Sequence, residues 1–419
     1  MNDIVLPSGT LAAPIGGSVT ENPATWNWPA PLSNGEATKR LAHLPILADQ
    51  RLMSSVMEER IAAQREATLY APPNQSVAVF QEILEKGRYS LSLRNPEDPQ
   101  YRVALHEIAR SLNWRNALGV PPSPIRDTRP TKGVMLAGVS GMGRNSLLRR
   151  IVGELNPIPQ PVPRLTNESP LLTQLPAIYC HWPASGGIDE FHYSFRSLID
   201  GLMGTPFLNE ALAGNFKKAH LNPSTKYIAI LVSAGVFIID GVNSLNFTKR
   251  SIELLLYLKD FQAYTGIPLV ISCTYRVYAE VVKMADIGAQ LGANTAYKFD
   301  MLPRGEDWDS LVATYWNQSK YSANVEVPVW LPGFAHKCTY GNLLLLGILM
   351  RNLHLEVTGE RLTIGKLNEA DCAKLADESF RAYRPLLAIL ERVLEGKSNV
   401  VSERDKVTWG DFLPLECFL

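Results

Sequence analysis

The sequence predicts an α/β protein in which a parallel sheet is covered by helices on both faces and is followed by an all-helical unit. Three observations predict this fold class. Short apolar runs alternate with segments of helical periodicity between residues 133 and 301. The first apolar run leads into a glycine-rich turn and then a helix. After Pro303 the strand pattern stops and only helical periodicity continues.

Length and composition set the outer limits. The chain has 419 residues, which exceeds an ordinary domain of about 100–200 residues and predicts more than one unit. Its 41 basic and 41 acidic residues cancel, so a nucleic-acid surface would have to come from local clustering of basic side chains. Five cysteines are dispersed without CxxC spacing, and no apolar run reaches 18 residues. These features predict a cytoplasmic protein with reduced thiols and no membrane segment.

Two regions precede the predicted sheet. Residues 1–50 are rich in Pro, Gly, Ser and Asn and are expected to form an extended arm, with Trp26 and Trp28 docking on a surface of this chain or of another. Residues 51–130 are expected to be a helical region that ends in a proline-rich linker, with helices at about 50–66, 76–86 and 101–114.

Residues 131–305 are predicted to form the α/β core. Strands are expected at 133–137, 177–182, 235–239, 268–272 and 296–301. The intervening segments 147–155, 190–203 and 250–264 have helical spacing, and Gly266 is placed to end the last of them. Strands that alternate with helices in this way form parallel sheets.

The remainder is predicted to be a helical lid, residues 306–395, and a tail, residues 396–419. Helices are expected at 307–316, 342–353, 368–376 and 379–394, with Asp307 and Asn368 as N-caps. The tail carries Trp409, Phe412 and Phe418 on a polar background. It is either a docking peptide for another protein or a segment that packs back on its own domain.

The glycine-rich turn has the spacing of a phosphate-binding loop, G-x-x-x-x-G-K-[ST], over Gly138–Asn145. Such a loop directs backbone N–H groups and a helix N-terminus at phosphate oxygens. Two positions differ from the pattern, because Arg144 replaces the lysine and Asn145 replaces the hydroxyl residue that ligates magnesium. Ser146 lies about 100° further around the helix, so it is badly placed to substitute. The candidate nucleotide-binding residues are Gly138, Gly141, Gly143, Arg144, Asn145 and Ser146. The alternative is a glycine-rich turn of another doubly wound fold.

A second element of the site follows the run Val236–Ile239. Asp240 is placed at the carboxyl edge of the sheet, where it is a candidate catalytic residue and magnesium ligand; the alternative is a turn aspartate. The next residue is Gly241, where ATP-hydrolysing relatives carry a glutamate that polarises water. Thr274 ends the next strand and is a candidate for contact with the γ-phosphate, or a strand-end cap.

These segments together resemble the AAA+ transposition regulators TnsC and TniB, with MuB more distant. The similarity covers residues 50–395, and its most specific piece is Pro268–Tyr275. The other segments are Tyr70–Pro73, Arg94–Pro96, Gly138–Ser146, Val236–Asp240, Ser251–Leu256, Trp308–Trp316 and Tyr340-Gly341.

The resemblance implies an ATP-dependent regulator that assembles as a homo-oligomeric ring or filament around double-stranded target DNA. It would recruit a DDE transposase and, in some cases, a target-selection protein. Lysines between the second and third strands face DNA in this family. The candidate DNA-binding residues here are Lys217, Lys218, Lys226, Lys249 and Arg250, which would make sequence-independent phosphate contacts; the alternative is a solvated helix face.

Three departures from the family pattern bear on its ATP cycle: Arg144-Asn145, Gly241, and the absence of arginine from Met284–Asn294. They favour an adaptor in which hydrolysis is impaired or absent, with ATP as the implied cofactor and Mg²⁺ left open. Two alternatives remain. One is an active DNA-stimulated ATPase that uses another acid, such as Asp189 or Glu190. The other is a pseudo-ATPase adaptor in defence or signalling.

Overall fold

A computed structural model describes residues 22–43, 69–112, 121, 123–125, 131–167, 169–215, 218–317, 322, 325–396 and 401–418. The expected helix at 50–66 and most of the linker at 121–130 lie outside these residues. None of the helices in the described ranges is long and apolar enough to cross a membrane.

The core is a parallel sheet of five strands, β4-β5-β6-β1-β7, and the α/β fold class is as expected. The strands are β1 (Val134–Gly138), β4 (Ala177–His181), β5 (Val236–Val242), β6 (Leu269–Thr274) and β7 (Tyr297–Phe299). The strand β1, which leads into the glycine-rich loop, lies between β6 and β7, and Gly138 is in register with Thr274. The ends of β1 and β6 therefore meet where the glycine-rich loop begins.

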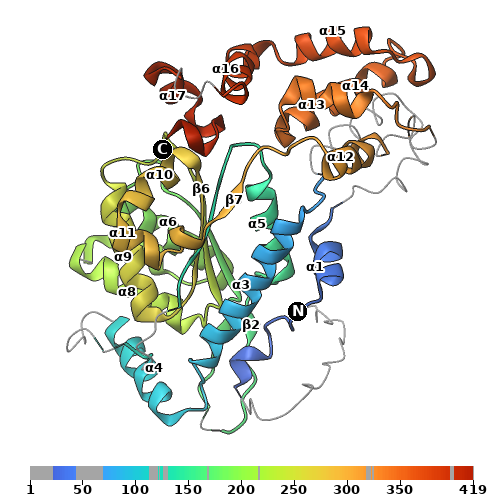
Figure 1. Ribbon diagram of the computed structural model, residues 1–419. Helices are drawn as coiled ribbons and strands as arrows, with labels where there is room; N and C mark the ends of the chain where they lie inside the picture. Colours follow the sequence, from blue (N-terminus) through green and yellow to red (C-terminus); the bar gives the residue numbers. More distant parts are fainter. Residues whose placement is uncertain are drawn as a thin grey trace.

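Helices cover both faces of the sheet (Figure 1). The helices α3 (Asn74–Ser92) and α5 (Arg144–Glu154) lie on one face. The other face is covered by α6 (Ile188–Met203), α8 (Lys218–Leu231), α9 (Ser251–Thr265), α10 (Tyr275–Lys283) and α11 (Ala285–Gln290). Connections between parallel strands are right-handed, so a connection's direction across the sheet decides which face its helix covers. The connection from β1 to β4, which contains α5, runs toward the β4 edge, and the later connections run the opposite way. The additional helix α4 (Pro99–Leu112) packs against α8 through Tyr101, Leu105 and Ile108.

Most strand and helix boundaries lie within a few residues of the expected ones, and the differences have local causes. The apolar run 227–239 is the end of α8 and the start of β5, separated by a turn at Ser233 with φ 45°. Asn368 caps α15 (Glu369–Ser379) as expected. The Asp307 N-cap is wrong, because α12 (Glu306–Trp316) begins after Gly305 and Asp307 lies within its first turn.

The arm is less extended than expected. A helix, α1 (Asn34–Leu41), forms behind a capping box in which Ser33 and Glu36 bind each other's backbone N–H. Trp28 is buried in the same chain and donates from Nε1 to the carbonyl of Leu84, 2.8 Å away. Trp26 is 45% exposed.

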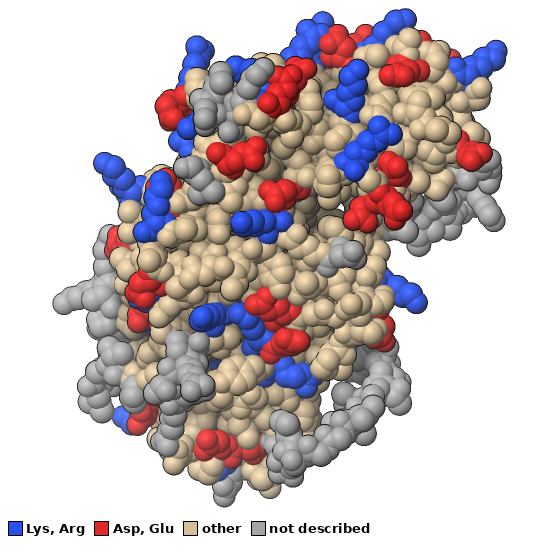
Figure 2. Space-filling view, viewed as in Figure 1, with Lys and Arg blue, Asp and Glu red and all other residues tan. Residues whose placement is uncertain are grey.

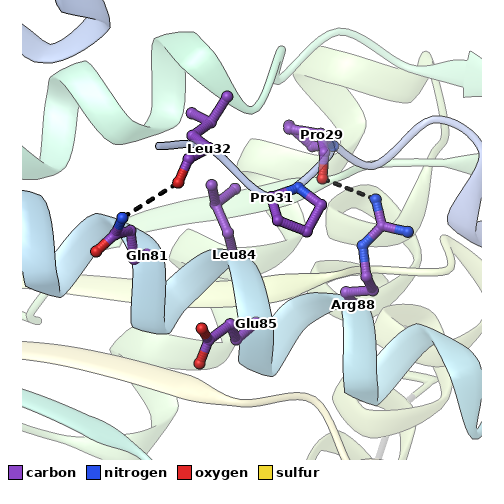
Figure 3. Close-up of a pocket in the computed structure, with 7 residues that line it drawn as sticks. All are labelled: Pro29, Pro31, Leu32, Gln81, Leu84, Glu85 and Arg88. Carbon is purple, nitrogen blue, oxygen red and sulfur yellow. Dashed lines mark hydrogen bonds between the residues drawn. The ribbon is translucent and has the colours of Figure 1, made fainter. Parts of the chain in front are cut away.

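The arm crosses α3 beside a small cavity. Figure 3 shows the side chains of Gln81 and Arg88 reaching from α3 to the carbonyl oxygens of Leu32 and Pro29, at 3.2 and 2.9 Å. Side chains of α3 thus donate hydrogen bonds to carbonyl groups of the arm that have no partner in a sheet. These hydrogen bonds fix the path of the arm over α3.

The residues after β7 form two further apolar clusters. The helices α12, α13 (Leu331–Thr339), α14 (Leu343–Thr358) and α15 share a core that contains Trp308 and Trp316, both fully buried. The chain then continues through α16 (Arg384–Leu394) and α17 (Glu403–Trp409). It ends in two 3-10 turns, η10 (Gly410–Phe412) and η11 (Leu415–Cys417), and returns to α10 (Figure 1). The tail therefore packs back on its own chain, through Leu413 and Cys417.

A buried polar cluster joins α6 to α8. His192 is fully buried, with Nδ1 2.8 Å from Thr225 Oγ1 and Nε2 2.7 Å from Asn222 Oδ1. Burial lowers the pKa of His192 to about 4, the Asn222 hydrogen bond opposes this shift, and Arg196 adds to it. The imidazole is therefore neutral in the folded protein at neutral pH.

This cluster predicts a loss of stability at acid pH. The unfolded chain takes up a proton on His192 near pH 6.5, whereas the folded chain takes it up only near the lower pKa. The free energy of unfolding should therefore fall by about 2 kcal/mol between about pH 7.5 and pH 5 through this group. Urea unfolding of wild type and His192→Gln at both pH values isolates the contribution of this histidine. Equal pH dependence in the two proteins would contradict it.

Candidate functional site

The glycine-rich loop joins β1 to α5 at the carboxyl edge of the sheet. Gly143 precedes α5 with φ 80°, a left-handed conformation that a side chain would strain. The N–H groups of the first turn of α5 have no partner inside the helix. They point out of its N-terminus, the geometry in which a loop holds phosphate oxygens.

A cavity of about 300 Å³ opens over this loop. One wall is the loop itself, from Ser140 to Ser146. The opposite walls come from three other places in the chain, and they are lined by Leu69, Tyr70, Ala71, Leu311, Tyr315, Leu343 and Leu344. The volume is at the small end of the range for ligand sites, and one polar wall facing an apolar one is typical of them.

Arg144 is the cation of the cavity. Its side chain is 94% buried, since only 6% is exposed, and its Nη1 atom has no hydrogen-bond partner among the described residues. Burial lowers the pKa of the guanidinium, and the nearby carboxylates of Asp240 and Asp411 oppose that shift. A buried donor of this kind is costly unless an acceptor binds it, so the site is suited to an anion.

Asn145 and Ser146 follow on the first turn of α5. Both line the cavity and are exposed. Asn145 offers an amide where a magnesium-binding loop offers a hydroxyl.

Asp240 lies in the interior, fully buried. Its Oδ1 accepts the N–H of Gly241 and its Oδ2 accepts the hydroxyl of Tyr179, each at 2.7 Å. Burial raises the pKa of Tyr179, and the carboxylate of Asp240 raises it further, so the phenol remains a donor. Both oxygens that would ligate a metal are already bound by the protein.

The residues present therefore fit phosphate but do not fit magnesium. Asn145 has no hydroxyl, Asp240 is bound by Tyr179 and Gly241, and the guanidinium of Arg144 brings a positive charge to the same place. No group of three or more metal-ligating side chains occurs in the described part of the chain.

The residue after Asp240, Gly241, differs from the glutamate of ATP-hydrolysing proteins in its backbone conformation as well as in its side chain. The pairing of β5 with β6 shifts register between Ile239 and Val242, and Gly241 has φ 82° within that bulge. The strand continues past Asp240, beyond its expected end at Ile239. A glutamate at residue 241 would need the same left-handed conformation, which costs roughly 1–2 kcal/mol for an L-residue.

Thr274 ends β6 and its hydroxyl donates to Asp411 Oδ1 at 2.7 Å. The carboxylate of Asp411 also accepts from Ser244, from N at 3.0 Å and from Oγ at 2.8 Å. The backbone oxygen of Asp411 accepts from the N–H of Ser140 at 2.7 Å. Asp411 belongs to the tail, and sequence reasoning missed it because no spacing signal links it to residues 137 positions away.

The lid also contacts the loop. Asn342 caps α14 and donates from Nδ2 to the carbonyl of Ser140 at 3.0 Å. The N–H of Leu344 donates to the carbonyl of Gly141 at 3.0 Å. These hydrogen bonds hold the start of α14 against the loop.

Of the candidate DNA-binding residues, Lys217 and the side chain of Lys218 lie outside what the structure describes. Lys226 is 11% exposed, forms an ion pair with Asp260 and lies over the rings of Tyr257 and Tyr264. Lys249 and Arg250 are exposed immediately before α9. Ten residues of α9, a length of roughly 15 Å, separate Lys249 and Arg250 from Asp260, the ion-pair partner of Lys226.

The acids named as alternative water-orienting groups lie at the start of α6. Glu190 accepts from Ala184 N, Ser185 N and Ser185 Oγ, and these hydrogen bonds lower the pKa of its carboxyl. Asp189 and Glu190 do not belong to the residues that line the cavity.

Comparisons with known proteins give a structural likeness at low sequence identity. No family model matches the chain, and no curated protein matches it at a significant level. Among solved structures, it is similar to the Walker-type ATPase PABY2304 of Pyrococcus abyssi, at 14% identity and a TM-score of 0.41, over 64% of this chain and 72% of that one. Membership of the TnsC and TniB family stays a prediction.

The site predicts that restoring the consensus residues does not restore hydrolysis. An Arg144→Lys, Asn145→Thr, Gly241→Glu variant should release phosphate from ATP no faster than wild type, with or without DNA, because Asp240 stays bound to Tyr179. Urea unfolding should find it less stable than the Arg144→Lys, Asn145→Thr control by roughly 1–2 kcal/mol, the cost of the left-handed glutamate. DNA-stimulated phosphate release by the triple variant would contradict this.

Proposed function

We propose that this protein is a P-loop adaptor that binds the phosphates of a nucleotide, hydrolyses it slowly or not at all, and acts in DNA transposition. The observation that carries the nucleotide part is the buried guanidinium of Arg144. Arg144 lines the cavity that opens over the glycine-rich loop, and its Nη1 has no partner among the described residues. A phosphate oxygen would accept from it and from the N–H groups of α5.

The same geometry supports the proposal that hydrolysis is impaired. Hydrolysis of a nucleoside triphosphate needs a group that orients water and a cation that neutralises the developing charge. Gly241 supplies no such group, and Asp240 is held by Tyr179 and Gly241. A residue that orients the nucleophile contributes on the order of 10²–10⁴ in rate.

The role in transposition rests on the resemblance of residues 50–395 to the TnsC and TniB regulators. Under this proposal the chain assembles as a ring or filament on double-stranded DNA and binds a DDE transposase or a target-selection protein. On the face in Figure 2, basic and acidic side chains of the described residues are interspersed. DNA contact would therefore come from a few local cations, of which Lys249 and Arg250 are exposed.

Removing the guanidinium should abolish nucleotide binding. An adenosine nucleotide at about 100 Kd should stabilise the wild type by about 2.7 kcal/mol, whereas Arg144→Ala should gain nothing, because it loses the buried cation. Arg150→Ala, on the same helix but outside the cavity lining, is the control and should respond as wild type does. Thermal unfolding with ADP or ATP, with and without Mg²⁺, measures this. Equal stabilisation of Arg144→Ala and wild type would refute it.

Removing the two exposed cations before α9 should weaken DNA binding. Lys249→Ala/Arg250→Ala should lower affinity for duplexes of any sequence and flatten the salt dependence by about 0.9 in slope for each phosphate ion pair removed. Lys374→Ala/Arg381→Ala removes two exposed charges from the lid and should leave binding unchanged. Fluorescence anisotropy across a salt series checks this. An unchanged salt dependence in the Lys249→Ala/Arg250→Ala variant would count against DNA contact at these two residues.

The substitution Lys226→Ala should lower the free energy of unfolding instead, because Lys226 forms an ion pair with Asp260.

A further inference from the structure

The tail places a carboxylate at the carboxyl edge of the sheet. Asp411 accepts hydrogen bonds from Thr274 and from both N and Oγ of Ser244. Its turn is held in place by further contacts, since Arg276 Nη1 donates to the carbonyl of Lys406 at 2.5 Å and Leu413 is fully buried. The carboxylate is therefore a fixed part of the folded chain.

Asp411 lies at one end of the phosphate loop. Its carbonyl accepts from Ser140, the third residue of the loop, and its carboxylate is bound to Thr274, which pairs with the loop's first residue, Gly138. A nucleotide whose α- and β-phosphates lie over the N-terminus of α5 would extend a third phosphate toward this edge of the sheet. An anionic group of the protein already occupies it.

The extent of the cavity agrees with this arrangement. The residues that line it run along the loop from Ser140 to Ser146 and along the apolar wall. Asp240 and Thr274 are at most 3% exposed and are not among them. The open space thus lies over the loop and the start of α5, and the side chains at the sheet edge, Asp240, Thr274 and Asp411, do not line it.

We infer that the cavity takes a nucleoside diphosphate in preference to a triphosphate, and takes it without a divalent cation, because Asp411 fills the place of the third phosphate. This inference rests on the proposed function. Arg144 lines the cavity and is 6% exposed, and its guanidinium, whose Nη1 has no hydrogen-bond partner among the described residues, supplies the positive charge for the second phosphate. A third phosphate would meet the carboxylate of Asp411, a like-charge contact that disfavours the wrong ligand.

The test compares ADP with ATP on the full chain, by competition with a fluorescent ADP analogue, in EDTA and in Mg²⁺. Wild type should bind ADP at least about tenfold more tightly than ATP, and EDTA should leave the ADP affinity unchanged. Asp411→Ala should bring the two affinities within about threefold by improving ATP binding. Glu416→Ala removes an exposed carboxylate of the same segment and should keep the preference for ADP.

The possible results are distinguishable. Equal affinities for ADP and ATP in wild type, or a preference for ADP that Asp411→Ala does not alter, would overturn the inference and leave nucleotide binding in place. Absence of binding by either nucleotide in wild type and in Asp411→Ala would overturn the proposed function itself. If Asp411→Ala fails to fold, Asp411→Asn keeps the acceptor for Thr274 while removing the charge, and the same change of preference is expected.

Discussion

The site depends on one physical constraint, a guanidinium buried beneath a glycine-rich loop with one donor left unpaired. Burial of Arg144 is costly, and the carboxylates of Asp240 and Asp411 offset part of that cost. Its Nη1 atom has no hydrogen-bond partner among the described residues, and the residue lines the cavity. A lysine would present a compact point charge, whereas the planar guanidinium of Arg144 is larger and its charge lies near the carboxylates of Asp240 and Asp411.

Several parts of the chain meet at the glycine-rich loop and the sheet edge beside it. The sheet supplies Asp240 and Thr274, the lid supplies Asn342, and the tail supplies Asp411. Tyr179 on the edge strand binds Asp240, so the carboxylate serves a structural hydrogen bond. The site combines a glycine-rich loop with polar groups that are satisfied by one another. Under the proposed function, such a site would bind a nucleotide and turn it over slowly or not at all.

The sequence was informative wherever the signal is local. The order of the sheet strands, the loop at Gly138–Ser146 and the cap at Asn368 follow from periodicity and short motifs, whereas the helices α8, α10, α11, α13 and α17 were not predicted. It was uninformative where a contact joins residues far apart in the sequence, or where the local backbone conformation determines the structure. Within the apolar run 227–239 the strand was predicted at 235–239 but the end of α8 was not, because both are buried, and the bulge at Gly241 leaves no pattern. The contact of Asp411 with Thr274 joins residues 137 positions apart, which no periodicity can reveal.

The glycine-rich loop is hydrogen-bonded from two directions. The carbonyls of Ser140 and Gly141 accept from the first residues of α14, and the N–H of Ser140 donates to the tail. The three consecutive peptide groups that begin at the N–H of Ser140 thereby link the helical lid to the C-terminal tail. A displacement of this short segment would therefore strain the hydrogen bonds to the helical region and to the tail together.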